Sequence, residues 1–192
     1  RRAILETADF GIDRIDVSPL LDFASWDDLA ALRADPPSPV IEGVMIKRRD
    51  SAYIAGRPRG PWFKWKRDPM VVDAVLLYAQ RGHGKRSGFY SDFTFGLWDG
   101  DMLVPVGKAY FGFTDEELRE LDRFVRNNTV ERFGPVRSVA AKLVLEVAFE
   151  GLNASGRHKS GVAMRFPRIS RIRWDKPAAE ADRLETLKAM IP

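Results

Sequence analysis

The chain has 192 residues, of which 45% are hydrophobic and none is cysteine, and its formal net charge is +4. This length suits one domain of ordinary size or two small ones. The lack of cysteine excludes disulfides, thiolate metal sites and a cysteine nucleophile, and it indicates a reducing compartment. No apolar run approaches the roughly 18 residues that a membrane span needs. His83 and His158 have no metal-ligand spacing, so a histidine zinc site is not expected.

The first third of the chain predicts a small region with both a helix and strands. Residues 12–17 (IDRIDV) alternate weakly, as in a strand. Residues 25–34 (SWDDLAALRA) predict a helix with Ser25 as its N-cap. The runs 40–47 (VIEGVMIK) and 62–67 (WFKWKR) predict two further strands, which a turn-rich segment separates.

The rest of the chain predicts a β-rich domain. Strands are expected at residues 71–80, 89–98, 102–110, 143–150 and 161–173. A helix at 114–127 begins with a capping box from Thr114 to Glu117 and carries one apolar stripe. Five strands with a helix between the third and fourth is the order of an OB-fold, a small Greek-key barrel that often binds nucleic acid. A last helix is expected at 178–191.

We therefore predict a mainly β protein with a few helices. Its first part, over residues 1–69, precedes a five-stranded OB-fold barrel over residues 70–192.

Residues 60–69 (GPWFKWKRDP) raise the first functional question. As a strand, this stretch puts Lys64 and Lys66 on one face, roughly 6–7 Å apart, where two like charges repel. Together the two lysines could hold a phosphate by charge-assisted hydrogen bonds. The alternative is an ordinary strand face on which both lysines are solvated.

Glu42 lies in the otherwise apolar run VIEGVMIK, next to Gly43. A carboxylate buried alone is costly, so Glu42 needs a partner, and a divalent metal or a ribose hydroxyl would serve. The alternative is an edge-strand glutamate that faces water. Gly43 would let another backbone or a ligand come close.

The last predicted strand is strongly basic. The segment from residue 157 to residue 176 contains one acid, Asp175, and seven cations: Arg157, Lys159, Arg165, Arg168, Arg171, Arg173 and Lys176. A period of two puts Arg165, Arg171 and Arg173 on one face. Arg168 and Lys176 then face the opposite way. Such a strand suits phosphate contacts and stacking on bases, and a basic edge strand that deters aggregation is the alternative.

The loop at residues 80–88 (QRGHGKRSG) is a smaller candidate. Lys85 and Arg86 could contact a nucleic-acid backbone there, although a plain hairpin loop explains the composition equally well. The loop does not match the Walker phosphate-binding pattern.

Three of these stretches resemble the ATP-dependent DNA ligases of the covalent nucleotidyltransferase superfamily. EGVMIK (42–47), WFKWK (62–66) and RFPRISRIRWDK (165–176) are similar to that family's motifs IV, V and VI, in the same order and at sensible spacing. The segments RGHGKRSGFYSDFTFGLWD and GFTDEEL also look like the ligase barrel. The resemblance covers most of the chain and is greatest to the compact bacterial enzymes.

The resemblance implies a reaction in three steps, with ATP and Mg²⁺ or Mn²⁺ as cofactors and nicked double-stranded DNA as partner. A lysine attacks the α-phosphate of ATP, AMP passes to the 5′-phosphate at the nick, and the 3′-hydroxyl displaces AMP. Positioning and charge neutralisation dominate such phosphoryl transfers. The reaction would serve DNA replication, repair or recombination in the bacterial cytoplasm, away from any membrane.

Motif position also implies roles in the first part of the chain. Lys64 and Lys66 would contact the α-phosphate, and Glu42 would hold the divalent metal. Lys47 ends the same motif strand, with a less defined role. Asp68 would be the hinge between closed and open states.

In the barrel, Arg173 and Lys176 would orient the departing pyrophosphate, with Arg171 assisting. The DNA-contacting residues would be Lys85, Arg86, Arg157, Lys159, Arg165 and Arg168.

The family's nucleophile lies in a K-x-D-G motif, which these residues lack. The Asp-Gly pair of this sequence is Asp99-Gly100, and Leu97 stands where the lysine would be. The resemblance therefore implies the C-terminal part of an adenylation domain followed by a whole barrel. Such a chain is expected to need its missing N-terminal part to become adenylylated or to seal nicks.

Two alternatives stay open at this point. One is a free-standing OB-fold module that binds nucleic acid, although such a module needs neither Glu42 nor the paired lysines. The other is part of an RNA ligase or a capping-type nucleotidyltransferase, which the R-F-P-R ending disfavours.

Overall fold

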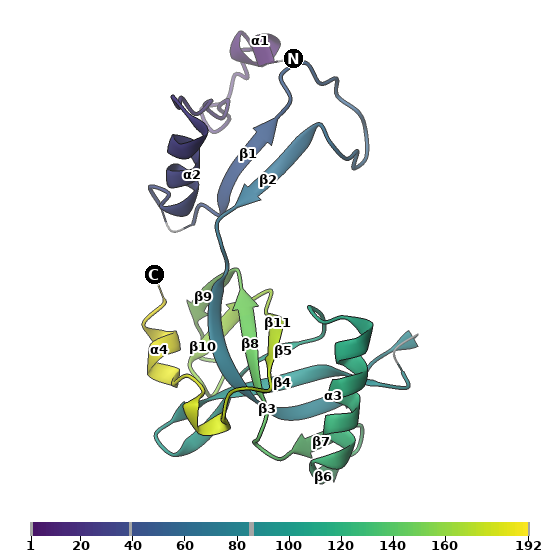
Figure 1. The fold of residues 1–192 in the computed structure, drawn as a ribbon. Helices are drawn as coiled ribbons and strands as arrows, with labels where there is room; N and C mark the ends of the chain where they lie inside the picture. The colour runs from purple at the N-terminus through teal and green to yellow at the C-terminus, as the bar shows by residue number, and fades with distance from the viewer. Residues whose placement is uncertain (1, 39, 85–86, 192) are drawn as a thin grey trace. The chain divides into compact units, whose positions relative to one another are not determined.

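The computed structural model describes residues 2–38, 40–84 and 87–191. It divides into two compact units, Arg1–Arg67 and Asp68–Pro192 (Figure 1), so the division lies two residues before the predicted boundary. Within the described ranges, every helix is too short or too polar to span a bilayer.

The first unit is built on a two-stranded antiparallel hairpin. Its elements are α1 (Arg2–Glu6), α2 (Trp26–Ala34), β1 (Gly43–Lys47) and β2 (Trp62–Lys66). The predicted helix is confirmed, since the Ser25 hydroxyl accepts a hydrogen bond from the Asp28 amide at 3.1 Å. The predicted strand at 12–17 is wrong. This segment is irregular. Ile12 and Ile15 are exposed, so the alternating pattern has no buried face to stabilise a strand.

Helix α2 packs on one face of the hairpin through aromatic and cationic contacts. The Arg33 guanidinium lies 5.0 Å from the Trp65 ring centroid, and the Trp26 and Trp65 rings are 6.5 Å apart. Arg33 Nη1 also donates to the Lys66 carbonyl at 2.6 Å. Because successive side chains alternate, Lys64 and Lys66 lie on the face away from Trp65.

The second unit is a strongly curved antiparallel sheet with the strand order β11-β8-β3-β4-β5. Its strands are β3 (Met70–Arg81), β4 (Tyr90–Asp99), β5 (Met102–Ala109), β8 (Val144–Phe149) and β11 (Arg168–Arg173). The two ends of the sheet approach each other where the Ile169 amide donates to the Phe111 carbonyl at 3.1 Å. A Cβ at Gly112 (φ 104°) would lie 2.9 Å from the Ile169 carbonyl carbon, so this approach needs glycine. The predicted five-stranded OB-fold barrel is confirmed.

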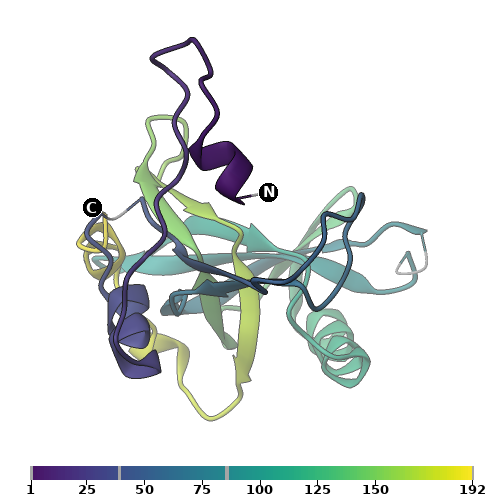
Figure 2. The same ribbon diagram turned by 90° about the horizontal axis from the view of Figure 1, so that it is seen from above.

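Helix α3 (Asp115–Asn127) packs against the barrel on the side opposite to α4 (Leu184–Lys188), as Figures 1 and 2 show. Its capping box is formed: Thr114 Oγ1 accepts from the Glu117 amide, and Glu117 accepts from the Thr114 amide. Its apolar stripe is buried in the core. A buried Asp122 ties the helix to the sheet by accepting from the Tyr90 amide at 2.9 Å.

The strand predictions miss two hairpins. One is formed by β6 (Thr129–Phe133) and β7 (Val136–Val139), and the other by β9 (Gly151–Ala154) and β10 (Val162–Arg165). The strand predicted at 161–173 is therefore wrong as a single element. It breaks between β10 and β11, where Phe166 adopts a left-handed φ of 53° before Pro167.

The predicted C-terminal helix is also too long. Only Ala178–Glu180, as a 3₁₀ turn, and α4 are helical. The chain between them is extended at Ala181, and its Asp182 amide donates to the Asp73 carbonyl at 2.8 Å. Pairing with the sheet therefore overrides helix propensity at this point.

Candidate functional site

The hairpin of the first unit brings Glu42 and Lys66 together. Lys66 Nζ lies 3.6 Å from Glu42 Oε2, and each side chain is 38% exposed. Lys64 is exposed on the same face of β2, opposite Met45. Two cations and one carboxylate therefore share a solvent-accessible face, which is an arrangement that can hold an anionic ligand.

Gly43 makes this arrangement possible. It has a φ of 144°, and a Cβ there would lie 2.7 Å from Lys66 Cα and would collide with the Trp65 carbonyl oxygen. Only glycine permits this close approach of the two strands. The structure therefore agrees with the prediction that Gly43 admits a neighbouring backbone, here that of β2.

Lys47 lies at the far end of the same hairpin. Its Nζ is 5.0 Å from the ring centroid of Trp62, which is its direct partner across the two strands. This contact holds Lys47 against an aromatic surface rather than against Glu42.

In the barrel, Asp73 of β3 gathers two of the predicted cations. Asp73 Oδ2 accepts from Arg173 Nη1 at 2.9 Å and from Lys176 Nζ at 2.8 Å. The three side chains are 13%, 21% and 19% exposed, respectively. Asp73 Oδ1 is buried without a hydrogen-bond partner in the described part of the chain. Sequence reasoning missed Asp73, although it stands in an apolar run (VVDAVLL) just as Glu42 does.

Asp175 occupies the other side of the Arg173 guanidinium. Its carboxylate accepts from Nε at 3.0 Å and from Nη2 at 2.8 Å, so Arg173 is held by two acids. These hydrogen bonds lower the pKa of Asp175 to about 2 and raise the pKa of Arg173. A phosphate that is to bind Arg173 through this pair of donors must replace Asp175.

The predicted faces of the basic strand need correction. Arg171 and Arg173 do flank the buried Ile172 and share a face, but Arg165 belongs to a different strand, β10. Lys176, predicted to face the opposite way, meets the same Asp73 oxygen as Arg173. The reasons are the break at Phe166 and Pro167 and a bulge between Ile169 and Arg171, which together interrupt the period of two.

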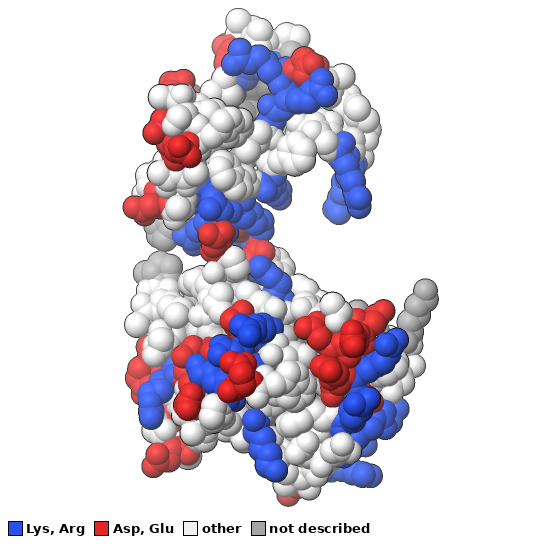
Figure 3. Space-filling view, in the orientation of Figure 1, with Lys and Arg blue, Asp and Glu red and all other residues white. Residues whose placement is uncertain are grey.

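The remaining predicted DNA contacts are distributed over the barrel. Arg168 lies 3.7 Å from Glu150, and three further cations are exposed: Arg157, Lys159 and Arg165. Asp68 is the first residue of the second unit. Lys85 and Arg86 lie outside the described residues. Figure 3 shows Lys and Arg mixed with Asp and Glu on the visible face of this unit, not one continuous basic area.

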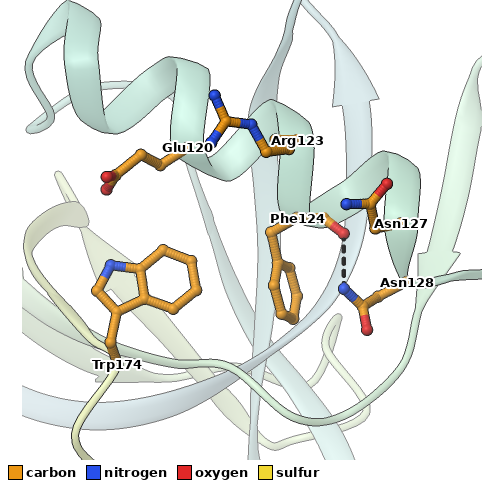
Figure 4. A pocket seen from close by; sticks show the side chains of 6 residues that line it. All are labelled: Glu120, Arg123, Phe124, Asn127, Asn128 and Trp174. Atoms are coloured by element: carbon orange, nitrogen blue, oxygen red, sulfur yellow. Dashed lines mark hydrogen bonds between the residues drawn. The ribbon is translucent and has the colours of Figure 1, made fainter.

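A shallow hollow of about 420 Å³ lies between α3 and the end of β11 (Figure 4). The Phe124 and Trp174 rings meet edge to face in its wall, with centroids 5.7 Å apart. The other lining residues are Glu120, Arg123, Asn127 and Asn128. The contact anchors Trp174 on α3, which fixes the chain between Arg173 and Asp175.

The donor set for a divalent cation is small. No group of three or more His, Cys, Asp or Glu side chains suited to a metal occurs within the described ranges. Mg²⁺ is often held by one or two carboxylates together with substrate phosphates and water. Glu42 fits such a role as a single carboxylate donor beside two lysines.

Comparison with known proteins agrees with the motifs. The family model described as the ATP dependent DNA ligase C terminal region matches residues 86–176. A probable DNA ligase of Koribacter versatilis is 49% identical over 144 residues, which are 75% of this chain and 25% of that protein. A DNA ligase of Archaeoglobus fulgidus is 35% identical over 190 residues, which are 98% of this chain and 34% of that protein. The chain thus spans 25% and 34% of the length of these two relatives.

A solved structure supports the same fold. The ligase domain from M. tuberculosis LigD has a TM-score of 0.53 and 24% identity, covering 74% of this chain and 47% of that one. At this identity the likeness shows the fold alone.

Proposed function

Since this chain carries the C-terminal region of the ATP-dependent DNA ligase family, we propose that it is the C-terminal part of a nick-sealing enzyme. The enzyme joins a 3′-hydroxyl to a 5′-phosphate in duplex DNA through enzyme–AMP and DNA–AMP intermediates. The observation that carries this proposal is the hairpin of β1 and β2, on which Glu42, Lys64 and Lys66 share one face.

The hairpin lysines act on the α-phosphate. Lys64 and Lys66 present two positive charges where negative charge develops in each transfer, and fixed cations stabilise such a transition state. A divalent ion held by Glu42 supplies further charge neutralisation when bound. Lys66 then exchanges its contact with Glu42 for a contact with phosphate.

The barrel cations act on the leaving group. Arg173 and Lys176 orient pyrophosphate during the first transfer, and the exposed Arg171 assists them. In the described structure Arg173 and Lys176 are paired with Asp73. We therefore assign them to a step in which phosphate competes with an internal carboxylate.

The first covalent bond requires a lysine that this sequence does not contain in a K-x-D-G setting. Asp99 instead ends β4 and pairs with Met102 of β5, and Gly100, with a φ of 59°, begins the two-residue turn between these strands. The nucleophile is assigned to a segment N-terminal to these residues. The barrel supplies its remaining cations, Arg157, Lys159, Arg165 and Arg168, to the DNA, and Asp68 is the hinge.

A nick-sealing assay tests the proposal. The chain is joined to an N-terminal ligase segment that contains K-x-D-G and is supplied with ATP, Mg²⁺ and nicked substrates made of DNA or of RNA. We expect sealing of the DNA nick by the joined protein and no AMP transfer to the 192-residue chain alone. Transfer of AMP to the isolated chain, or sealing of RNA in preference to DNA, would overturn the proposal.

We assign the nick-sealing reaction to DNA replication, repair or recombination. A free-standing nucleic-acid-binding module is not favoured, because the matched relatives are ligases and the similarity extends through the hairpin unit.

A further inference from the structure

The loop that joins β1 to β2 is the most basic surface segment that the proposed roles leave unused. Residues 48–61 (RRDSAYIAGRPRGP) contain four arginines and one aspartate. We call this segment the arginine loop. Except for the half-buried Ser51 and Pro61, its residues are exposed, and Tyr53 and Ile54 are 62% and 56% exposed.

The base of the loop is ordered by its own hydrogen bonds. The Arg48 amide donates to the Pro61 carbonyl at 2.8 Å, and the Ser51 hydroxyl donates to the Arg48 carbonyl at 2.8 Å. Pro58 and Pro61 restrict the backbone further along the chain. The loop therefore loses less conformational freedom on binding than a glycine-serine loop of the same length.

One arginine of the loop is neutralised internally. Arg48 makes two hydrogen bonds of 2.9 Å to Asp50, and this contact lowers the pKa of Asp50. Within the described residues, no ion pair involves Arg49, Arg57 or Arg59. The loop thus presents about three uncompensated positive charges, and Figure 3 shows Lys and Arg side chains along this part of the first unit.

Charged side chains on an exposed edge strand can deter aggregation, but the three arginines lie in the loop between β1 and β2 and not on a strand. Solubility alone does not require three unpaired arginines beside two lysines of the same hairpin. A polyanion of extended shape is the partner that such a loop fits.

We propose that the arginine loop is a phosphate-contacting arm that holds the nicked duplex independently of base sequence. The inference rests on the proposed ligase function and adds a contact that the motif residues do not provide. Arg49, Arg57 and Arg59 bind phosphates as charges, so each contact releases condensed counterions from the DNA. The loop therefore raises affinity and salt sensitivity without taking part in the phosphoryl transfers.

The test measures duplex binding by the 192-residue chain. Fluorescence anisotropy with a labelled nicked duplex gives the affinity at several salt concentrations between about 50 and 200 mM. The slope of log affinity against log salt is negative. For the triple variant R49A/R57A/R59A, we expect its magnitude to decrease by roughly 2.7, at about 0.9 for each of three lost phosphate contacts. At the lowest salt we expect roughly 10- to 100-fold weaker binding, and R49K/R57K/R59K should retain most of the slope.

A charge-matched variant is the control. R119A/R123A/R132A removes three exposed arginines from α3 and β6, where Arg119 and Arg123 lie among the acidic side chains of the helix. Its slope should change by less than one. Circular dichroism melts should coincide for all variants, because none of the substituted side chains is buried.

The outcomes separate the two proposals. If the chain binds the duplex and the loop variant keeps the parental slope, the arm is refuted while the ligase function stands. If the chain fails to bind duplex at any salt, the arm is refuted, and sealing by the joined protein alone decides the ligase function. A loop variant that loses binding to polyglutamate but keeps its DNA slope would identify an acidic protein as the partner and also refute the arm.

Discussion

The two units use the same residue types in opposite electrostatic settings. In the hairpin unit, the Lys66–Glu42 pair is 3.6 Å long and 38% of each side chain is exposed. In the barrel, Arg173 and Lys176 contact one Asp73 oxygen at 2.9 and 2.8 Å, and Asp73 is only 13% exposed. A loose, solvated pair contributes little to stability and is easily exchanged for a ligand. A close, mostly buried cluster is costly to break. The hairpin cations are therefore available for chemistry, whereas the barrel cations also hold the fold.

The largest expected effect lies in the hairpin, on activity. We expect K64A and K66A each to reduce AMP transfer in the joined enzyme by roughly 10²–10³-fold, which is typical for loss of one group that stabilises a transition state. Single-turnover formation of the AMP adduct measures this loss. The melting temperature should change little, because Lys64 is exposed and Lys66 makes only a long, half-exposed ion pair with Glu42. A large drop in melting temperature would make the lysines structural and would remove the contrast with the barrel.

The opposite result is expected for Asp73. In D73N, the loss of the carboxylate leaves Lys176 and one side of Arg173 without their acid in a mostly buried position. We expect the free energy of unfolding of the second unit to fall by roughly 3 kcal/mol, at the lower end of the range for a broken buried pair. Urea unfolding followed by tryptophan fluorescence measures the change. D175N is the matched control, and its effect should be much smaller because that carboxylate is 57% exposed. Equal effects of the two variants would mean that the buried Asp73 and the exposed Asp175 stabilise the barrel to the same extent.

A third variant tests how the hairpin is built. In G43A, the new methyl group meets the backbone of β2, so we expect the hairpin to lose roughly 1–3 kcal/mol of local stability. Hydrogen exchange of the β1 and β2 amides measures this loss. Gly56 is the control, since its φ is also positive, at 89°, but a Cβ there has no neighbour within 4 Å. If G56A accelerated exchange as much as G43A, backbone strain rather than strand contact would be the cause.

The elements that the sequence predicts are those with a local signal. The α3 capping box is a local signal within four residues, and the apolar, β-prone runs of β3, β4, β5 and β8 are local as well, so the sequence predicts these elements close to their observed bounds. The hairpin β6–β7 carries a usable signal, Gly134-Pro135 between two β-prone runs, which was not recognised. The break at Phe166 depends on one left-handed residue, for which Pro167 was the only sequence warning.

The two groups of site residues also differ in whether a local pattern reveals them. Glu42 and Lys66 were both singled out from short motifs, and the hairpin register brings them together. The Asp73 cluster joins residues 100 and 103 positions apart, across β3, β8 and β11. Only the strand order of the barrel places these residues side by side. Pairing of this kind is a property of tertiary topology, so no local pattern could have predicted that Asp73 binds Arg173 and Lys176.

The smallest expected effect concerns the titration of Asp175. Arg173 lowers the pKa of this carboxyl to about 2, compared with roughly 3.9 in an unfolded chain. A carboxyl whose pKa is depressed by folding adds stability that is fully present above the unfolded value and is lost as the pH falls towards 2. NMR titration of the Asp175 side chain should therefore show a midpoint near 2 in the parent chain. In R173Q the midpoint should return towards roughly 3.9. An unshifted midpoint in the parent chain would mean that Asp175 does not hold the guanidinium in solution, and Arg173 would then be held by Asp73 alone.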